Sequence, residues 1–529
     1  MSEGTQPIAD SSFDGEMTRR EFVTKVSKIA GGAAAVQMLA AMGVFAESGG
    51  NPAFAASPRL TTPRKLVIIG AGIAGMSVAY EMAAAGYQVV VLEAAAKAGG
   101  RNKTARTGDT ITEVNSSGQT VTQTCTFDND PSLYMNLGPG RIPYHHRALL
   151  GYCKKFGVAL EPFLANNRAS YHYNPSALGA KPVRQRQTYT DTRGFIADLL
   201  VRSVNRGALD VDLSSSDKSK LIAMLRQFGD LNGSGKYVGS TRGGFSNQPN
   251  QGNGGAIINT PLPLSGYLNS VEWWREWDED FNHQQSLMQP VGGMDKIVQA
   301  FVARMGQYIK YNAVVTSINN TATGVSVTYT QNGQTLTETG DYAVCTIPAG
   351  VLSSIPNNFK ATTNTAIKGI QYQKSVKIGF QSTRWWEDEN FVYGGITWCE
   401  SPLTQMWYPS SGFHSAQGVL VAAYTWDSAS DAYFQNMTPA TRISTAANLA
   451  NSIHSGFSTR ASKGLSMAWG AMPYQRGSWA TDGTANPAAL QVPDGRVYFA
   501  GEHLSGMPSW QEGAIVSGQR VMTQIVARG

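Results

Sequence analysis

Cysteine is scarce in this chain. Only Cys125, Cys153, Cys345 and Cys399 occur among 529 residues. None of them stands in a Cys-x-x-Cys pair or in the Cys/His spacing that is typical of structural metal sites. Four thiols are also too few to form a disulfide scaffold for a chain of this length. We therefore expect buried free thiols and no metal site.

Charge and long apolar runs are limited as well. Charged residues make up 15% of the chain, the formal net charge is +6, and no run rich in Lys or Arg occurs. Nucleic-acid-binding proteins usually carry a basic patch or stripe, so the sequence argues against that class. The only long apolar stretch outside candidate core strands lies near the N-terminus, so we expect the mature chain not to span a membrane. The length indicates two or three domains.

The N-terminal apolar stretch has the features of an export signal. The pair Arg19-Arg20 stands directly before a weakly apolar run over residues 29–45, and small residues follow at 53–56. This order resembles a twin-arginine signal, with cleavage near the end of residues 1–56. An ordinary amphipathic helix is the alternative. The signal predicts export to the periplasm or the extracellular space.

The clearest local pattern begins directly after this region. Apolar residues over 66–69 predict a buried parallel strand, and the glycine-rich sequence 70–75 follows at once. A helix is predicted over 76–85, a second strand over 89–92, and Glu93 stands at the end of that strand. This order of strand, turn, helix, strand and acid is typical of a Rossmann-type dinucleotide-binding fold.

Each residue type in this pattern has a chemical reason. Gly70 permits a tight turn, Gly72 lets the backbone approach a pyrophosphate, and Gly75 allows the helix to pack closely on the strand. The N-terminus of the helix faces the negative charge of the phosphates. Glu93, 18 residues after Gly75, can accept hydrogen bonds from the adenosine ribose hydroxyls, and an acid there disfavours a 2′-phosphate.

Further glycine-rich segments indicate which dinucleotide binds. Gly99-Gly100-Arg101 resembles the second glycine-rich segment of FAD-containing oxidases. Far along the chain, residues 497–502 predict a strand ending in Gly501-Glu502, and residues 510–515 open a helix of small and apolar residues. The dipole of a helix whose N-terminus points at the flavin would favour the electron-rich reduced ring.

Five separated motifs together resemble the flavin amine oxidase family, and within it the bacterial L-amino-acid oxidases. They are residues 70–101, 138–143, 290–295, 377–380 and 501–515, and the likeness runs from about Lys65 to the C-terminus. The resemblance implies FAD as the cofactor. It assigns FAD contacts to Gly70, Gly72, Ile73, Ala74, Gly75, Glu93, Ala94, Gly100, Arg101, Gly138, Pro139, Gly140, Arg141, Val315, Gly501, Glu502, Gln511, Gly513, Ala514 and Ile515.

The same resemblance bears on how the flavin is held. Some members attach FAD through a cysteine just before the aromatic residue that corresponds to Trp510. Here that stretch, residues 504–509, contains no cysteine. We therefore expect non-covalent FAD.

Substrate and catalytic residues follow from the same motifs. The resemblance implies that Arg141 binds the substrate carboxylate, and a planar guanidinium can do so with two parallel bonds. An arginine paired to a structural acid is the alternative. Tyr424 and Trp510 correspond to the two aromatic walls that face the flavin, and Gly506 is assigned to the substrate site. Lys377 corresponds to the lysine that holds a water against the flavin ring.

Two assignments have competing interpretations. The spacing from Lys377 to the pair Trp385-Trp386 is one residue shorter than the family pattern, so a solvated surface lysine is the alternative. The histidines His145, His146 and His503 can carry protons near neutral pH. With no carboxylate partner or motif beside them in the sequence, we predict structural or surface roles for all three.

The order of the motifs predicts a discontinuous α/β architecture. We assign residues 60–123, 290–348 and 462–529 to a Rossmann-type FAD-binding domain. A mixed-sheet substrate domain is predicted over residues 124–189 and 349–461. Apolar residues at helical spacing predict a helical insertion over 190–289. Within that insertion, the glycine- and asparagine-rich segment 240–255 is expected to be an exposed loop or a flap over the active site.

The resemblance implies a flavin-dependent oxidase. We expect hydride transfer from the α-carbon of an L-amino acid with a large apolar side chain, with oxygen as acceptor and a 2-oxo acid, ammonia and hydrogen peroxide as products. Three alternatives stay open: an oxidase of amines without a carboxylate, an amino-acid monooxygenase, and a protein that binds flavin without turnover. A homodimer is one assembly that we consider.

Overall fold

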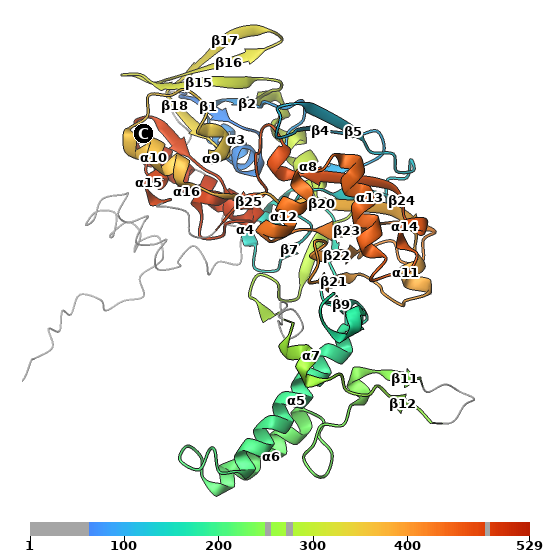
Figure 1. Ribbon diagram of the computed structural model, residues 1–529. Helices are drawn as coiled ribbons and strands as arrows, with labels where there is room; N and C mark the ends of the chain where they lie inside the picture. The colour runs from blue at the N-terminus through green and yellow to red at the C-terminus, as the bar shows by residue number, and fades with distance from the viewer. Residues whose placement is uncertain (1–62, 249–254, 271–278, 482–486, 529) are drawn as a thin grey trace, which may run out of the picture.

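The computed structural model describes residues 63–248, 255–270, 279–481 and 487–528 (Figure 1). The predicted export signal, residues 1–56, lies outside the described residues. Figure 1 shows a body of layered sheets and helices from which a helical arm projects. This arrangement has the mixed α/β character expected from the sequence.

One layer of the body is a parallel five-stranded sheet built from three distant parts of the chain. Its strands pair in parallel in the order β14, β2, β1, β18 and β26. The predicted discontinuity is therefore confirmed, because strands from both ends and from the middle of the chain pair in one sheet. The bounds are Ile309–Lys310 for β14, Gln88–Leu92 for β2, Lys65–Ile69 for β1, Tyr342–Cys345 for β18 and Val497–Phe499 for β26.

Both faces of this sheet are buried. Successive residues of a strand point to opposite faces, and in β1 Leu66 and Ile68 pack into one apolar cluster while Val67 and Ile69 pack into another. This double burial explains why the strands are continuous apolar runs. The elements packed on the first face are α3 (Ile73–Ala84), α4 (Arg147–Phe156), α8 (Asp295–Met305) and α16 (Gln511–Arg528), and those on the second are β15 (Val314–Asn320), β16 (Val325–Gln331), α9 (Ala349–Leu352) and α10 (Ala361–Gly369).

The second layer is a seven-stranded mixed sheet. Its strands are antiparallel except for the parallel pair β9 and β21. Helices α11 (Trp385–Asp388), α12 (Ser428–Gln435), α13 (Pro439–Ala450) and α14 (Phe457–Arg460) pack against it. In order, the strands are β10 (Val183–Arg184), β9 (Tyr171–Tyr173), β21 (Gly395–Cys399), β22 (Gln405–Tyr408), β23 (Gln417–Tyr424), β20 (Val376–Thr383) and β24 (Ser462–Ala468).

The position of β24 differs from the expected boundary between the domains. The sequence analysis assigned residues from 462 onward to the FAD-binding part, whereas β24 pairs with β20 at the edge of the seven-stranded sheet. The physical reason is that the partner of a strand is chosen by pairing across the sheet, and the residues 462–468 alone do not indicate that partner. The chain returns to the cofactor region only after β24.

The helical arm consists mainly of two long helices. Helix α5 (Gln185–Asn205) leads away from the body and α6 (Ser215–Phe228) returns beside it (Figure 1). The side chain of Ser214 accepts a hydrogen bond from the backbone N–H of Asp217, so Ser214 caps the start of α6. These helices have the character predicted for the insertion, and the short helix α7 (Leu264–Leu268) follows them.

The segment expected to form a flap has another structure. Its described part contains β11 (Phe245–Asn247), which pairs with β12 (Ile257–Ile258) in a two-stranded hairpin. Figure 1 shows this hairpin beside the arm, away from the body. The flap interpretation is therefore wrong for the described residues of this segment, because the hairpin belongs to the arm. Residues 249–254 lie outside the described part of the chain.

Short strands complete the body and connect the two large sheets. All four cysteines are buried free thiols, as the sequence predicts. Among the residues that the structure describes, no helix combines the length and the apolar character needed to cross a membrane. The short strands are β3 (Thr104–Ala105), β4 (Thr110–Val114), β5 (Thr120–Thr124), β6 (Met135–Asn136), β7 (Ile142–Pro143), β8 (Leu160–Pro162), β13 (Leu287–Pro290), β19 (Tyr372–Gln373) and β25 (Trp479–Ala480), and helix α15 (Ala488–Gln491) precedes β26. The longer strand β17 (Gln334–Gly340) pairs with β16.

Candidate active site

A cavity of about 730 Å³ lies between the two large sheets. Its walls come from the C-terminal ends of β1, β2 and β18, from the segment after β26, and from the end of β23. The volume is in the range of small-molecule and cofactor sites. The predicted site residues that line it are Gly70, Gly72, Ile73, Ala74, Glu93, Ala94, Gly100, Arg101, Gly138, Pro139, Gly140, Arg141, Val315, Tyr424, Gly501, Glu502, Gly506, Trp510, Gln511 and Ala514.

Four predicted residues do not line this cavity. They are Gly75, Gly513, Ile515 and Lys377. A Cβ atom on Gly75 would lie 2.0 Å from the carbonyl oxygen of Gly70, and one on Gly513 would lie 2.1 Å from that of Met507. Both glycines therefore act through close packing behind the wall of the cavity. Ile515 is fully buried in the core beneath the parallel sheet.

The glycine-rich turn after β1 fits a phosphate group. Gly70 has a φ of +105°, in the left-handed region that favours glycine. A Cβ atom on Gly72 would meet nothing within 4 Å, and Gly72 lines the cavity. Packing within the protein thus does not require glycine at position 72. A group bound in the cavity against the backbone explains that residue, and the adjacent N-terminus of α3 favours an anion.

Glu93 braces this turn from the end of β2. Its two carboxylate oxygens accept hydrogen bonds from the backbone N–H groups of Ala71, at 2.7 Å, and Ala95, at 2.8 Å. Burial raises the pKa of Glu93 above its usual value, although both backbone bonds act in the opposite direction. Each oxygen keeps a lone pair that can accept a further hydrogen bond from a ligand hydroxyl in the cavity.

A partly buried ion pair joins the second glycine-rich segment to the C-terminal one. Arg101 Nη1 lies 2.6 Å from Glu502 Oε1 and donates to the carbonyl oxygen of Ser478 at 3.1 Å. Glu502 also accepts the backbone N–H of Ser509 at 2.9 Å. Burial by itself raises the pKa of Glu502, but the charge of Arg101 opposes it, and the pKa lies below its usual value. The pair therefore holds two distant segments on one wall of the cavity.

The start of α16 offers unsatisfied polar groups to the cavity. Both side-chain amide atoms of Gln511 are buried, and neither has a hydrogen-bond partner among the described residues. Gln511 lines the cavity in the first turn of α16, where backbone N–H groups are also unsatisfied. Together with Gly72, these polar groups fit a dinucleotide with a polar ring system. None of the four cysteines, all of which the structure describes, lines the cavity.

Arg141 lies inside an aromatic cage at the other end of the cavity. Its guanidinium carbon is 5.2 Å from the ring centre of Trp407, 5.4 Å from that of Trp510 and 5.7 Å from that of Trp426. Cation–π contacts of this kind stabilise a charge out of water. Burial lowers the pKa of Arg141 to about 10, with Tyr424 acting in the opposite direction, so the group stays charged at neutral pH.

Backbone geometry lets the cage close around this arginine. Arg141 lies between β6 and β7, and a Cβ atom on the preceding Gly140 would lie 2.5 Å from an atom of the Trp407 ring. Glycine at position 140 thus permits the approach of Trp407. Tyr424, at the end of β23, contacts the rings of Trp407 at 5.0 Å and Trp426 at 5.7 Å between ring centres. The aromatic walls predicted from the sequence therefore belong to a larger cluster.

Lys377 is buried, and the interpretation as a solvated surface lysine is wrong. Its exposed fraction is 1%. Its ammonium group donates to the carbonyl oxygens of Asn136, at 3.0 Å, and Gly138, at 2.7 Å, and lies 4.3 Å from the ring centre of Tyr424. Burial, with a smaller effect of the charge of Arg141, lowers the pKa of Lys377 to about 7.

Two histidines in the cavity are held neutral. His146 contacts the edge of Trp510 at 5.0 Å and His283 contacts the same ring at 5.7 Å. Burial lowers the pKa of His146 to about 3, and burial followed by the charge of Arg141 lowers that of His283 to about 2. His146 lines the cavity, although the sequence analysis expected only a structural or surface residue there.

The remaining predicted histidines have structural positions. His145 stacks on Phe281 with ring centres 4.1 Å apart and hydrogen-bonds with Asn282 at 3.0 Å. His503 is buried and does not line the cavity. Sequence analysis missed several residues of the aromatic end. Trp426 lies only two residues after Tyr424, just beyond the end of β23, and this closeness in sequence could have marked it. No local signal marked Trp407, Trp479 or His283.

Known proteins resemble this chain along most of its length. The family model described as flavin containing amine oxidoreductase matches residues 73–526. The chain is 27% identical over 483 residues to an L-amino-acid oxidase of Bothrops moojeni, covering 88% of this chain and 90% of that protein. It is 26% identical over 478 residues to the L-amino-acid oxidase of Vipera ammodytes ammodytes, covering 87% of this chain and 92% of the relative. These relatives come from snakes, whereas the resemblance pointed to bacterial members.

A solved structure shows the same fold. Wild-type putrescine oxidase bound to putrescine superposes with a TM-score of 0.57 at 18% identity, covering 88% of this chain and 100% of the other. At this identity the likeness concerns the fold alone.

The turn after β1 generates a test of cofactor binding. In Gly72→Ala the added methyl group fits the protein but occupies the space where a phosphate would lie, so we expect unchanged stability of the flavin-free protein. The Kd for FAD should rise by roughly 5- to 150-fold, because such intrusion costs about 1–3 kcal/mol. Flavin absorbance per chain and a titration of the apoprotein with FAD measure this.

Gly233→Ala is the matched control for that variant. A Cβ atom at position 233 also meets nothing within 4 Å, and Gly233 does not line the cavity. The control should bind FAD as the unmodified chain does. Equal FAD affinity of Gly72→Ala and Gly233→Ala would contradict the assignment of this turn to the cofactor.

Proposed function

Because the chain belongs to the family of flavin-containing amine oxidoreductases, whose model matches residues 73–526, we propose that it oxidises L-amino acids at the α-carbon with oxygen as electron acceptor. The observation that carries this proposal is the position of Arg141, a buried cation in the same cavity as the flavin-binding motifs. A guanidinium can bind a carboxylate with two parallel charge-assisted hydrogen bonds. Relatives named L-amino-acid oxidases support this choice.

Different residues of the cavity bind the substrate carboxylate and orient the rest of the substrate. Arg141 fixes the carboxylate, and the rings of Tyr424 and Trp510 confine the rest of the substrate so that its α-carbon faces the start of α16. The turn of Gly70 and Gly72, Glu93 and the start of α16 would hold FAD, which would supply a two-electron acceptor for the α-carbon hydride and a route for the electrons to oxygen, with hydrogen peroxide as the product. Water then hydrolyses the imino acid to a 2-oxo acid and ammonia. Orientation of this kind lowers the activation free energy by on the order of 7–11 kcal/mol at best.

The charge balance of the cavity favours a neutral substrate amine. A free amino acid carries an ammonium group, and hydride loss from the α-carbon requires the nitrogen lone pair. The positive charge of Arg141 and the dry aromatic walls both disfavour a second cation, so they lower the pKa of the bound amine. His146 and His283 are held neutral by burial and Arg141, so they add no positive charge.

The same features favour large neutral side chains. Tryptophan and tyrosine rings line the end of the cavity around Arg141. Among the described lining residues, the only carboxylates are Glu93 and Glu502, and both lie in the cofactor segments. A lysine substrate would bring a cation into these surroundings without a described acid to bind it. We therefore expect phenylalanine and leucine to be preferred over lysine.

The first experiment compares substrates without oxygen. Flavin absorbance is recorded on anaerobic mixing with L-phenylalanine, L-leucine, L-lysine, D-phenylalanine and tyramine, for the unmodified chain and for Arg141→Ala. We expect bleaching by L-phenylalanine and L-leucine, and a loss of roughly 30- to 5000-fold in the rate constant over Kd in the variant. Removing one partner of a buried charge pair costs about 2–5 kcal/mol.

Each alternative predicts another result. Bleaching by tyramine that is unchanged in Arg141→Ala would identify an oxidase of amines without a carboxylate. Formation of an amide in air, with little free peroxide, would identify a monooxygenase. A flavin that no amino acid or amine bleaches would identify a protein that binds FAD without turnover.

Residues 1–56 are proposed to be a twin-arginine export signal. The pair Arg19-Arg20 and the following apolar run support this, although these residues lie outside the described structure. In a bacterium with the twin-arginine pathway, changing both arginines to lysine should retain the chain in the cytoplasm. Arg59→Lys, beyond the predicted signal, is the control. Export of the double variant at the normal level would contradict the proposal.

A homodimer formed through the arm is the proposed assembly. Helix α6 buries only Leu225 of its 14 residues. Met224 and Phe228 on α6 are 57% and 44% exposed, and Ile196 on α5 is 54% exposed. Exposed apolar side chains that gather on a projecting arm mark an interaction site. A two-fold axis would bring two such faces together.

Light scattering after size-exclusion chromatography tests this assembly. We expect twice the mass of one chain for the unmodified protein, and the mass of one chain for Met224→Glu combined with Phe228→Glu. Val211→Glu is the matched control, because Val211 is 99% exposed but lies in the loop between the two helices. A single-chain mass for the unmodified protein would refute the homodimer.

A further inference from the structure

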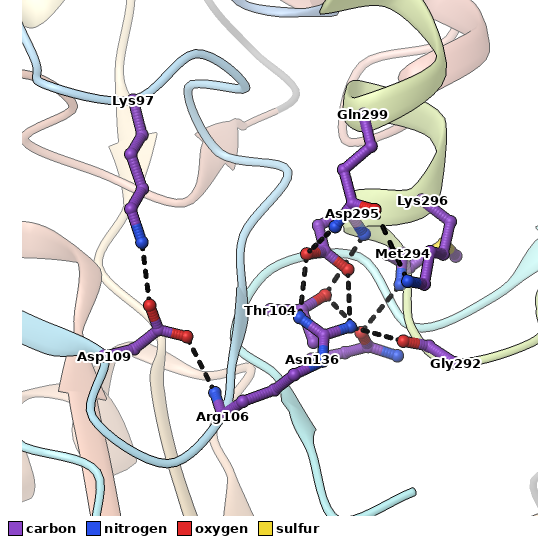
Figure 2. A network of polar contacts seen from close by, with 10 residues as sticks. All are labelled: Lys97, Thr104, Arg106, Asp109, Asn136, Gly292, Met294, Asp295, Lys296 and Gln299. Carbon is purple, nitrogen blue, oxygen red and sulfur yellow. Dashed lines mark hydrogen bonds and ion pairs between the residues drawn. The ribbon is translucent and has the colours of Figure 1, made fainter. Parts of the chain in front are cut away.

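The cavity does not explain why the motif over residues 290–295 is present. It resembles the family pattern, yet none of its residues lines the cavity described above. It forms the turn between β13 and α8. Figure 2 shows that this turn lies within a network of polar contacts with residues from three other segments.

An ion pair anchors the turn to the chain near β3. Arg106 donates with both terminal nitrogens to the carboxylate of Asp295, at 2.8 and 2.9 Å, and also to the carbonyl oxygen of Gly292 (Figure 2). Gly293 makes this approach possible. It has a φ of +112°, and a Cβ atom there would lie 2.8 Å from the methyl carbon of Thr104. A side chain at position 293 would therefore push the turn away from β3.

The side chain of Asn136 is the point at which these segments meet. Its Oδ1 atom accepts hydrogen bonds from the hydroxyl of Thr104, at 2.8 Å, and from the backbone N–H of Met294, at 2.9 Å (Figure 2). The Thr104 hydroxyl accepts in turn from the backbone N–H of Asp295 at 3.1 Å. Thr104 thus links the start of α8 to Asn136.

The backbone of Asn136 continues this chain of contacts toward the active site. Its carbonyl oxygen and that of Gly138 both accept from the ammonium group of Lys377, at 3.0 and 2.7 Å. The carbonyl oxygen between them, that of Leu137, accepts from the indole N–H of Trp469 at 3.0 Å. Three consecutive carbonyl groups are therefore held, and Arg141 follows three residues later.

We infer that Lys377 and the contacts of Asn136 position the loop that presents Arg141, so that the turn over residues 290–295 sets the affinity of the site for a carboxylate. The buried ammonium holds the loop from one side and the Thr104–Asn136 bond holds it from the other. This role is separate from any contact of Lys377 with the flavin or its water. It rests on the proposed function, because it concerns the carboxylate that Arg141 binds.

Thr104→Val is the sharpest test, because it removes a hydroxyl and changes no charge. Two probes are titrated into the flavin-loaded protein by calorimetry: benzoate, which carries a carboxylate, and benzamide, which has the same ring without the charge. We expect the Kd for benzoate to rise roughly five- to tenfold, the effect of losing one to two net hydrogen bonds. The Kd for benzamide should change less than about twofold.

Three further variants separate positioning from general loss of structure. Thr104→Ser keeps the hydroxyl and should restore benzoate binding. Lys377→Arg keeps a cationic side chain but alters the reach of its donors to the two carbonyl groups, so it should weaken benzoate binding as Thr104→Val does. Thr112→Val removes a hydroxyl that hydrogen-bonds with that of Thr122 at the surface of the β4–β5 hairpin, and it should leave the binding of both probes unaffected.

The outcomes distinguish the inference from the proposed function. Normal benzoate affinity in both Thr104→Val and Lys377→Arg, or an equal loss for both probes, would overturn the positioning role. Arg141→Met should lose most of the preference for benzoate over benzamide. If Arg141→Met keeps that preference, the carboxylate site itself is wrong. With L-phenylalanine, we expect KM to rise in Thr104→Val while kcat at saturation stays within about twofold, since one hydrogen bond to the binding loop is lost.

Discussion

The burial of one guanidinium group constrains most of the active site. A cation taken out of water is costly unless other groups stabilise it, and Arg141 is 7% exposed. Three indole rings surround it at cation–π distances. The neighbouring histidines remain neutral, and the ammonium of Lys377 is satisfied by carbonyl oxygens. A bound carboxylate would complete this arrangement, so the composition of the cage and the choice of substrate have the same physical origin.

The two sheets contribute different parts of this chemistry. The parallel sheet supplies the turn of Gly70 and Gly72, the carboxylate of Glu93 and the start of α3, which together suit a dinucleotide. The seven-stranded sheet supplies Tyr424 from β23 and Trp407 from β22, whereas Trp510 stands directly before α16, which packs on the parallel sheet. Contacts between segments that are distant in the sequence hold these parts in place. The buried pair of Glu113 and Arg442 links β4 to α13, and breaking a buried pair of this kind is strongly destabilising.

Polar contacts behind the cavity extend the site beyond the residues that face the substrate. The ion pair of Arg106 and Asp295, the Asn136 side chain and the Lys377 ammonium form a continuous path to the loop of Arg141. None of the first three residues in this path lines the main cavity. The inferred role of the glycine-rich turn over residues 290–295 is a structural connection, which would explain why a motif that does not line the cavity is part of the pattern.

Local sequence patterns were enough to predict the Rossmann-type start, the acid at Glu93 and the free cysteines, and the family resemblance added Arg141, Tyr424 and Trp510 as candidates. These signals are local, because strand, turn and helix are specified by neighbouring residues. Only the folded chain shows that Lys377 is buried and that β24 belongs to the seven-stranded sheet. It also shows that Trp407, His146 and His283 surround the site. Those features depend on contacts between segments that are far apart in the sequence, and no single segment encodes burial, strand pairing or the formation of the cage.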